Sequence, residues 1–127
     1  MAPKVLIVDD EPSIVLSLEF LMKNEGYDVA VARNGREALR RVDEFQPHLV
    51  LLDVMMPEIN GFDVCKKLRG DRRQQGLKIL LLTARGRRQE VERGLQAGAD
   101  AYVTKPFATR DIAERVRQLL GNEKKSA

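Results

Sequence analysis

Short apolar runs alternate with segments of helical spacing along the chain. Runs of four apolar residues occupy positions 5–8, 49–52 and 79–82. Such continuous runs are typical of strands that are buried on both faces of a parallel sheet covered by helices. Two weaker strands are predicted at 27–32 and 101–104, each after a glycine-containing break. The pattern therefore predicts five strands.

Between these strands, apolar residues recur every three or four positions, which predicts amphipathic helices. The recurring positions are Ile14, Leu18 and Leu21; Ala38, Val42 and Phe45; Phe62, Cys65 and Leu68; Val91 and Leu95; and Ile112, Val116, Leu119 and Leu120. Strand and helix alternate five times, which predicts right-handed crossovers and an open, mostly parallel sheet with helices on both faces. Sheets of this kind place their sites at the carboxyl ends of the strands.

Length and composition agree with one compact α/β domain. With 127 residues, 43% of them hydrophobic, the chain is long enough to bury a core and too short for two domains of ordinary size. We expect the domain to span residues 1–121 and residues 122–127 to form a flexible tail, which could begin a linker. The single cysteine, Cys65, excludes an internal disulfide and is expected to be a small core residue.

The chain carries no signal for a membrane or for export. No apolar run approaches the roughly 18–20 residues that cross a bilayer, and acidic residues follow the first apolar run too early for a signal peptide. We therefore expect a cytosolic protein.

Charge is distributed unevenly along the chain. Residues 1–63 hold 6 Lys and Arg against 12 Asp and Glu, whereas residues 64–127 hold 16 against 7. The basic half fits either solvated helix faces or a surface that binds a partner. Its basic residues are not interleaved with aromatic residues, which argues against a nucleic-acid surface.

The most informative side chains stand where the predicted strands end. Asp9 and Asp10 follow the first strand, Asp53 the third, Thr83 the fourth and Lys105 the fifth. These residues should meet at one edge of a parallel sheet. Several carboxylates close together are electrostatically costly, and a divalent cation such as Mg²⁺ gives a reason to tolerate them. Together with an ammonium and a hydroxyl group, they supply the parts needed to bind and transfer a phosphoryl group.

Five sequence blocks at these strand ends resemble one known family. They are Val8-Asp9-Asp10-Glu11-Pro12; Leu52-Asp53-Val54-Met55-Met56-Pro57 with Gly61; Leu82-Thr83-Ala84; Ala97-Gly98-Ala99-Asp100-Ala101-Tyr102; and Thr104-Lys105-Pro106-Phe107. From Lys4 to about Gly121 the chain resembles the receiver domain of two-component response regulators. The resemblance implies a flavodoxin-like, doubly wound (βα)₅ fold whose five parallel strands have the order 2-1-3-4-5.

The resemblance also implies how the acidic residues act. Asp53 is expected to be the nucleophile that accepts a phosphoryl group and forms an acyl phosphate. Asp10 and Asp53 are expected to bind Mg²⁺ directly, Asp9 partly through water, and Met55 through its backbone carbonyl. The domain is then a phosphoacceptor for signalling, not an enzyme that acts on a separate substrate, and it promotes its own phosphorylation and dephosphorylation.

Further residues match positions that bind or sense the phosphoryl group in this family. Lys105 is expected to bind phosphoryl oxygens, and the peptide bond between Lys105 and Pro106 to be cis. Thr83 is expected to move toward the phosphoryl group, and Tyr102 to fill the space that it leaves. These movements remodel the face formed by the fourth helix, fifth strand and fifth helix.

The resemblance implies protein partners. The phosphoryl donor is expected to be a sensor histidine kinase or a phosphotransfer protein. A downstream protein, or a second copy of the chain, is expected to bind the remodelled face. No membrane contact and no direct nucleic-acid contact are expected for this domain. Kinase specificity is expected in the first helix and in the loop after Lys105, at side chains such as Ile14, Leu18 and Phe107. A constitutive interaction module with an unused phosphorylation site is the alternative.

Two further features have a plain structural interpretation. His48, the single histidine, precedes the third strand at the edge opposite the acidic residues and is expected on the surface. Residues 85–88 are rich in arginine and directly follow the fourth strand. They fit equally a solvated first helical turn and a basic surface that steers an acidic partner.

Overall fold

Five strands alternate with five helices in the computed structural model, which describes residues 2–56, 58–84 and 88–121. The elements are β1 (Lys4–Val8), α1 (Pro12–Asn24), β2 (Asp28–Ala32), α2 (Gly35–Phe45), β3 (Leu49–Asp53), α3 (Gly61–Arg69), a 3₁₀ turn η1 (Arg72–Gln74), β4 (Lys78–Ala84), α4 (Arg88–Gln96), β5 (Ala101–Lys105) and α5 (Thr109–Leu120). Every predicted strand and helix is present, whereas η1 was not predicted. The expected tail at 122–127 lies outside the described residues.

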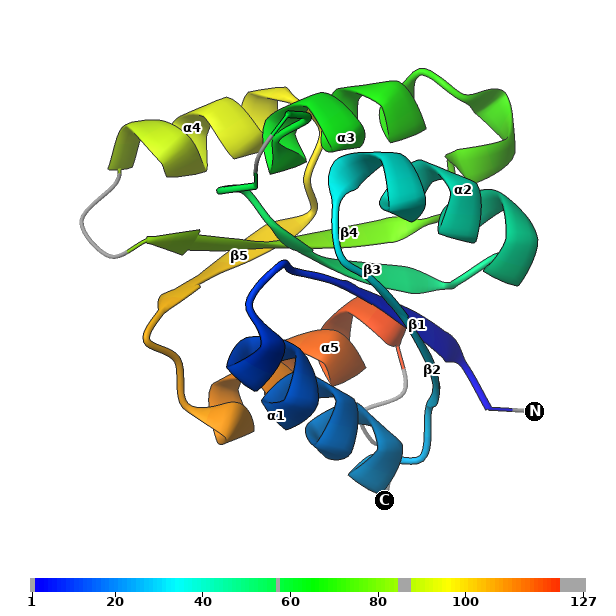
Figure 1. Ribbon diagram of the computed structural model, residues 1–127, viewed down its shortest axis with the longest axis vertical. Coiled ribbons are helices and arrows are strands. Elements are labelled where there is room, and N and C mark those ends of the chain that lie inside the picture. Colours follow the sequence, from blue (N-terminus) through cyan, green and yellow to red (C-terminus); the bar gives the residue numbers. More distant parts are fainter. Residues whose placement is uncertain (1, 57, 85–87, 122–127) are drawn as a thin grey trace.

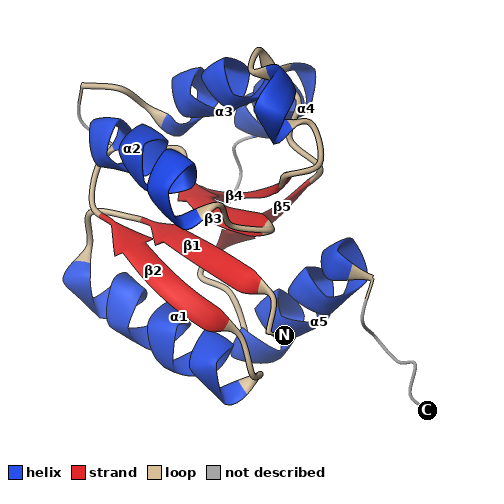
Figure 2. Ribbon diagram, turned by 90° about the vertical axis from the view of Figure 1, so that its right-hand side faces the viewer, coloured by secondary structure: helices blue, strands red, loops and turns tan. Residues whose placement is uncertain are grey.

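The strands form one parallel sheet with the order β2-β1-β3-β4-β5. Helices α2, α3 and α4 cover one face of this sheet, and α1 and α5 cover the other (Figures 1 and 2). The predicted fold class and strand order are thus confirmed. No helix in the described ranges has both the length and the apolar character needed to cross a bilayer.

The core lies in two layers because successive strand residues point to opposite faces. In β1, Leu6 and Val8 pack toward α2 and α3, whereas Val5 and Ile7 pack toward α1 and α5. All five residues of β3 are buried. The side chains of this central strand are therefore shielded from solvent on both faces of the sheet, and the strand ends at Asp53 inside the fold.

Helix α4 differs from the sequence prediction in the face that it buries. The spacing predicts Val91 and Leu95 in the core, but Leu95 is 48% exposed, while Gly94 and Ala97 are buried. A Cβ atom at Gly94 would overlap the side chain of Leu81 in β4. The helix thus lies close to the sheet through its small residues, and larger ones face outward.

The carboxyl end of α4 is fixed by Arg69 of α3. Its guanidinium donates hydrogen bonds to the carbonyl oxygens of Gly98 and Leu77, each at 2.7 Å, and pairs with Asp100. Asp100 in turn accepts the backbone N–H of Ile79 at 2.8 Å. The turn between α4 and β5 is therefore tied to both α3 and β4.

Candidate functional site

Three carboxylates meet at the carboxyl edge of the sheet, as the sequence predicts. Asp9 and Asp10 follow β1 and Asp53 ends β3, and one carboxylate oxygen from each lies within 4.8 Å of the others. Asp9 and Asp53 are buried, whereas Asp10 is exposed. Asp9 is oriented by the N–H of Glu11, which donates to Asp9 Oδ1 at 3.0 Å.

Lys105 brings a cation to these carboxylates from β5. Its Nζ lies 3.2 Å from Asp9 Oδ2 and 3.4 Å from Asp53 Oδ1, so that one ammonium group bridges the two buried acids. The peptide bond between Lys105 and Pro106 is cis. Residues almost one hundred positions apart in the sequence thus meet because β1, β3 and β5 end at the same edge.

The cluster carries more negative than positive charge. Burial, and next the neighbouring charge of Asp9, raise the pKa of Asp53 to about 6 although Lys105 opposes the change. Burial alone would lower the pKa of Lys105, but Asp53 and Asp9 together outweigh it and hold that pKa above its ordinary value. A second cation at this edge would therefore be bound favourably.

The donor atoms indicate which cation would fit. The three side chains offer carboxylate oxygens, which hard divalent ions such as Mg²⁺ prefer, and the described residues place no histidine or cysteine beside them. The exposure of Asp10 leaves room for coordinating water. The acidic triad is therefore consistent with a site for Mg²⁺.

The loop between β3 and α3 is held against Asp53. The N–H of Met55 donates to Asp53 Oδ1 at 3.2 Å, and the N–H of Gly61 donates to the carbonyl of Val54 at 3.1 Å. A Cβ atom on Gly61 would lie 2.5 Å from the carbonyl oxygen of Asp53. Only glycine lets α3 begin this close to the end of β3. The side chain of Met55 points outward and is 60% exposed.

Thr83 and Tyr102 lie on the neighbouring strands β4 and β5. Thr83 in β4 is fully buried, and its hydroxyl has no hydrogen-bond partner among the described residues. Tyr102 in β5 is 37% exposed and so turns partly toward solvent. A buried hydroxyl without a partner is costly and has full capacity to bond to a group that arrives nearby.

Other predicted residues lie away from this edge or outside the described ranges. His48 is exposed at the opposite edge, and its Nδ1 accepts the N–H of Lys4 at 2.9 Å. Cys65 is buried among core residues, and burial raises the pKa of its thiol to about 11, so it is unreactive. Of the arginine-rich stretch at 85–88, residues 85–87 lie outside the described part of the chain, as does Pro57 of the motif after β3.

One surface was missed by the sequence reasoning. Leu16 and Phe20 of α1 are each 69% exposed and stand four positions apart on one side of the helix. In contrast, Leu18, which was expected to contact a kinase, lies on the side of α1 that packs on the sheet. It is completely buried and is not available for a partner. The signal lay in the sequence, because apolar residues at 16 and 20 do not belong to the stripe that packs on the sheet.

Comparisons with known proteins agree on one family. Residues 5–117 match the response regulator receiver domain. The chain is 45% identical over 120 residues to the DNA-binding response regulator MtrA of Mycolicibacterium smegmatis, covering 94% of this chain and 51% of that protein. It therefore spans about half the length of the curated relatives that it matches.

Solved structures show the same fold. A putative response regulator from Chloroflexus aurantiacus matches with a TM-score of 0.92 and 34% identity, over 96% of this chain and 100% of that chain. The receiver domain of the sensor histidine kinase PA1611 from Pseudomonas aeruginosa, 24% identical, matches with a TM-score of 0.87 over 96% of this chain and 100% of that one. That structure has a magnesium ion coordinated in its active site cleft.

Proposed function

Because the chain belongs to the family of response regulator receiver domains, we propose that Asp53 is the residue on which it is phosphorylated. The observation that carries the proposal is the placement of Asp53. It ends the buried central strand, lies beside two other carboxylates, and has the Lys105 ammonium 3.4 Å from its Oδ1. Asp9 is already engaged by Lys105 and by the N–H of Glu11, and Asp10 faces solvent.

The donor is a phosphohistidine on a sensor histidine kinase or a phosphotransfer protein. A carboxylate oxygen of Asp53 attacks the phosphorus, and the P–N bond to the donor histidine breaks. The bonding electron pair leaves with the imidazole nitrogen, which then takes a proton from solvent. The N–H of Met55, which donates to Asp53 Oδ1, favours the charged carboxylate and orients it.

Mg²⁺ fits the oxygen atoms at this edge. Asp10 and Asp53 would hold it through their carboxylates, Asp9 partly through water, and Met55 through its backbone carbonyl. When bound, the ion neutralises charge on the transferring phosphoryl oxygens. Lys105 would neutralise further charge, since its ammonium already lies within 3.4 Å of Asp53 Oδ1 and 3.2 Å of Asp9 Oδ2.

Thr83 and Tyr102 convert phosphorylation into a change of surface. The unpartnered hydroxyl of Thr83 gains a hydrogen bond by moving toward a phosphoryl oxygen on Asp53. This movement opens space beneath β5, and the half-exposed ring of Tyr102 turns inward to fill it. The face made by α4, β5 and α5 therefore differs between the two states.

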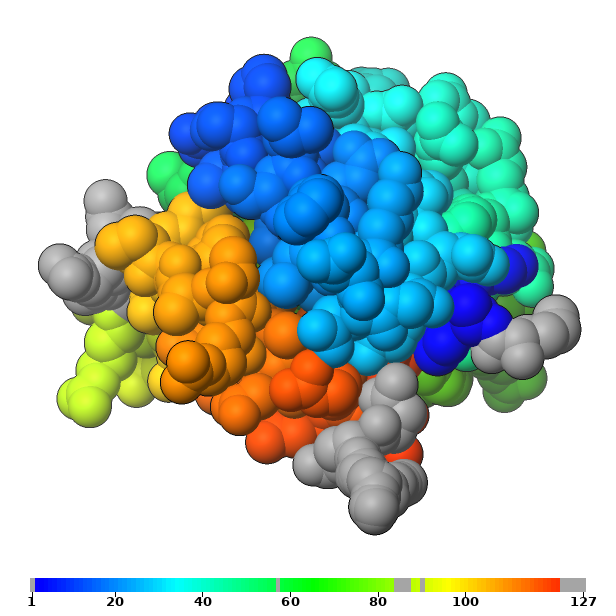
Figure 3. Space-filling model, turned by 90° about the horizontal axis from the view of Figure 1, so that it is seen from below, coloured from blue at the N-terminus to red at the C-terminus, as the bar shows by residue number. Residues whose placement is uncertain are grey.

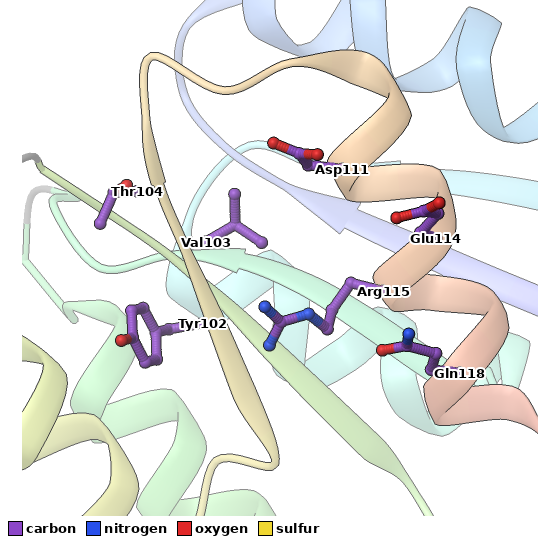
Figure 4. Close-up of a pocket in the computed structure, with 7 residues that line it drawn as sticks. All are labelled: Tyr102, Val103, Thr104, Asp111, Glu114, Arg115 and Gln118. Carbon is purple, nitrogen blue, oxygen red and sulfur yellow. The ribbon is translucent and has the colours of Figure 1, made fainter.

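The output partner meets this face. A groove of about 390 Å³ lies between β5 and α5, and Figure 4 shows Arg115 reaching from α5 toward β5 while Tyr102 points to the other side of the strand. Asp111 and Glu114 place negative charges on the same helix as Arg115. Charges of both signs on one face suit either a downstream protein or a second copy of this chain.

The kinase contacts α1. The exposed pair Leu16 and Phe20 offers an apolar ridge to a partner helix at i and i+4 spacing. Figure 3 shows α1 in blue beside the orange segment that follows β5, and Arg117 of α5 is joined to Glu25 at the end of α1 at 2.6 Å. A helix docked on this ridge would therefore also approach the loop after Lys105, which contains Phe107.

Intact-mass spectrometry after incubation with acetyl phosphate and Mg²⁺ tests the proposal. We expect a single phosphoryl adduct on the wild type. The adduct should be absent from Asp53→Asn and from wild type treated with a chelator. No adduct on the wild type, together with no binding of Mg²⁺ by calorimetry, would instead indicate a constitutive interaction module.

A further inference from the structure

Gly35, at the start of α2, supports the loop between β3 and α3. A Cβ atom built on Gly35 would lie 2.8 Å from both Cβ and the carbonyl oxygen of Ile59, and 3.1 Å from Ile59 Cγ2. The two distances of 2.8 Å are shorter than real Cβ atoms show, so the loop occupies the space that any larger residue at position 35 would need. Gly35 has no left-handed backbone angle. Its requirement here is the close approach of Ile59 and not an unusual conformation.

The start of α2 is a rigid support. Asn34 caps the helix because its Oδ1 accepts the N–H of Glu37 at 2.8 Å, and the Glu37 side chain accepts the N–H of Arg33 at 2.7 Å. These two hydrogen bonds fix the first turn of α2 on the residues that follow β2. The carbonyl oxygen of Ala32, the last residue of β2, accepts the N–H of Asp9 at 3.2 Å. The support is therefore joined directly to the acidic edge.

The same loop reaches Asp53 on its other side. Met55 donates its N–H to Asp53 Oδ1, and Gly61 packs against the backbone of Asp53 and Val54. Within the described residues, the loop is thus pressed between Asp53 and α2, with Ile59 resting on Gly35. A second contact, Arg36 Nε to Glu58 Oε1 at 3.6 Å, joins largely exposed side chains and contributes little.

We propose that Gly35 is a positioning residue for phosphorylation: by seating Ile59, it sets where the loop holds the N–H and the carbonyl of Met55 relative to Asp53. The proposal rests on the proposed function, in which Asp53 is phosphorylated and the Met55 carbonyl binds Mg²⁺. A methyl group at position 35 must displace Ile59, because α2 is fixed by its cap. Met55 belongs to the same loop as Ile59, so we expect a displaced Ile59 to change how the Met55 N–H meets Asp53 Oδ1.

The test compares Gly35→Ala with Gly76→Ala. Gly76 lies before β4 at the opposite edge of the sheet, and a Cβ atom there would meet nothing within 4 Å. Calorimetry measures the Mg²⁺ dissociation constant of each protein, and intact mass measures the rate of labelling by acetyl phosphate. Thermal unfolding in a chelator reports the fold alone.

Gly35→Ala should bind Mg²⁺ about tenfold more weakly and be labelled about tenfold more slowly, as is usual when a group that supports a metal ligand is displaced. Gly76→Ala should match the wild type in both measurements. The amide resonance of Met55 should shift in Gly35→Ala and stay in place in Gly76→Ala. A purely structural role would lower the unfolding midpoint in chelator and leave the Mg²⁺ dissociation constant of the folded protein unchanged.

A second pair of variants keeps the test decisive if Gly35→Ala does not fold. Ile59→Gly removes the side chain that rests on Gly35 and adds no atom, so it should also weaken Mg²⁺ binding. Gly35→Ala should weaken Mg²⁺ binding less in the Ile59→Gly background than in the wild type, because Ile59→Gly removes two of the three atoms that lie close to the added methyl group.

Three results separate the possibilities. The inference is overturned if the wild type is labelled on Asp53 while Gly35→Ala is labelled and binds Mg²⁺ equally well. If Gly35→Ala is unfolded, wild-type behaviour of Ile59→Gly overturns it in the same way. A wild type that neither binds Mg²⁺ nor takes up the phosphoryl group overturns the proposed function itself, and this inference falls with it.

Discussion

Replacing Asp53 by asparagine should stabilise the protein when Mg²⁺ is absent. Asparagine has nearly the same shape, can still accept the N–H of Met55, and leaves Lys105 paired with Asp9 at 3.2 Å. The pKa of Asp53 rises from 3.8 to about 6 on folding. At about 1.4 kcal/mol for each pKa unit, keeping this carboxylate ionised in the folded state costs about 3 kcal/mol at neutral pH. Asp53→Asn should remove that cost.

The direction of this pKa shift also predicts how the free energy of unfolding changes with pH. Between pH 3.8 and about 6 the folded protein holds more protons than the unfolded chain, so the free energy of unfolding of the wild type falls as pH rises through this window. Below the window Asp53 is protonated in both states. The advantage of Asp53→Asn should therefore be about 3 kcal/mol at pH 8, shrink to about 1 kcal/mol near pH 4.5, and disappear at lower pH.

Urea unfolding in a chelator, followed by circular dichroism at pH 8 and pH 4.5, measures the difference. Asp28→Asn is the control, since Asp28 is exposed at the far edge of the sheet. The reasoning is refuted if Asp53→Asn is no more stable than the wild type at pH 8, or if its margin is the same at both pH values. Saturating Mg²⁺ should reverse the order, because only the wild type keeps the full set of carboxylates.

Three further variants test the ion pairing, the coupling through Thr83 and the docking surface on α1. Lys105→Gln leaves two buried carboxylates without their ammonium, so the free energy of unfolding in chelator should fall by about 2 kcal/mol by urea titration; an unchanged value would contradict the ion pairing. Thr83→Val removes a buried hydroxyl that has no partner in the described structure, so the free energy of unfolding should rise by about 1 kcal/mol by urea titration. By NMR, however, the ring resonances of Tyr102 should no longer move on phosphorylation, and a normal shift would rule out coupling through Thr83. The double variant Leu16→Ala/Phe20→Ala should keep its stability and its labelling by acetyl phosphate while accepting phosphoryl groups from the kinase more slowly; equal transfer would place the docking surface elsewhere.

The sheet and its functional edge could be predicted because their signals are local. A run of four apolar residues that ends in an acid, such as 49–52 before Asp53, indicates both a buried strand and a side chain at its carboxyl end. Parallel strands bring such ends together whatever their separation in sequence. This is why Asp9, Asp53 and Lys105 could be grouped although β5 lies almost one hundred residues from β1.

The packing of α4 could not be predicted in the same way. The hydrophobic spacing favoured Leu95, but the helix buries Gly94 instead, and Ala97 is buried directly after the helix ends. Small residues carry almost no hydrophobic signal, yet they decide how closely a helix can approach a strand, here at Leu81. For the same reason the role of Gly35 is invisible in the sequence, because it depends on where Ile59 lies in space.

The energetic cost of the site explains how a small domain can respond to one phosphoryl group. A domain of this size is stable by only about 5–15 kcal/mol, and ionised Asp53 alone removes about 3 kcal/mol of it without Mg²⁺. The buried hydroxyl of Thr83 adds a second unsatisfied group at the neighbouring strand. In the proposed function, phosphorylation with Mg²⁺ bound would relieve both costs, since Asp53 would lose its uncompensated charge and the Thr83 hydroxyl would gain an acceptor. The free energy released at the acidic edge would then be available to favour a different arrangement of α4, which approaches β4 closely at Gly94, and of the edge strand β5, which carries the 37% exposed Tyr102.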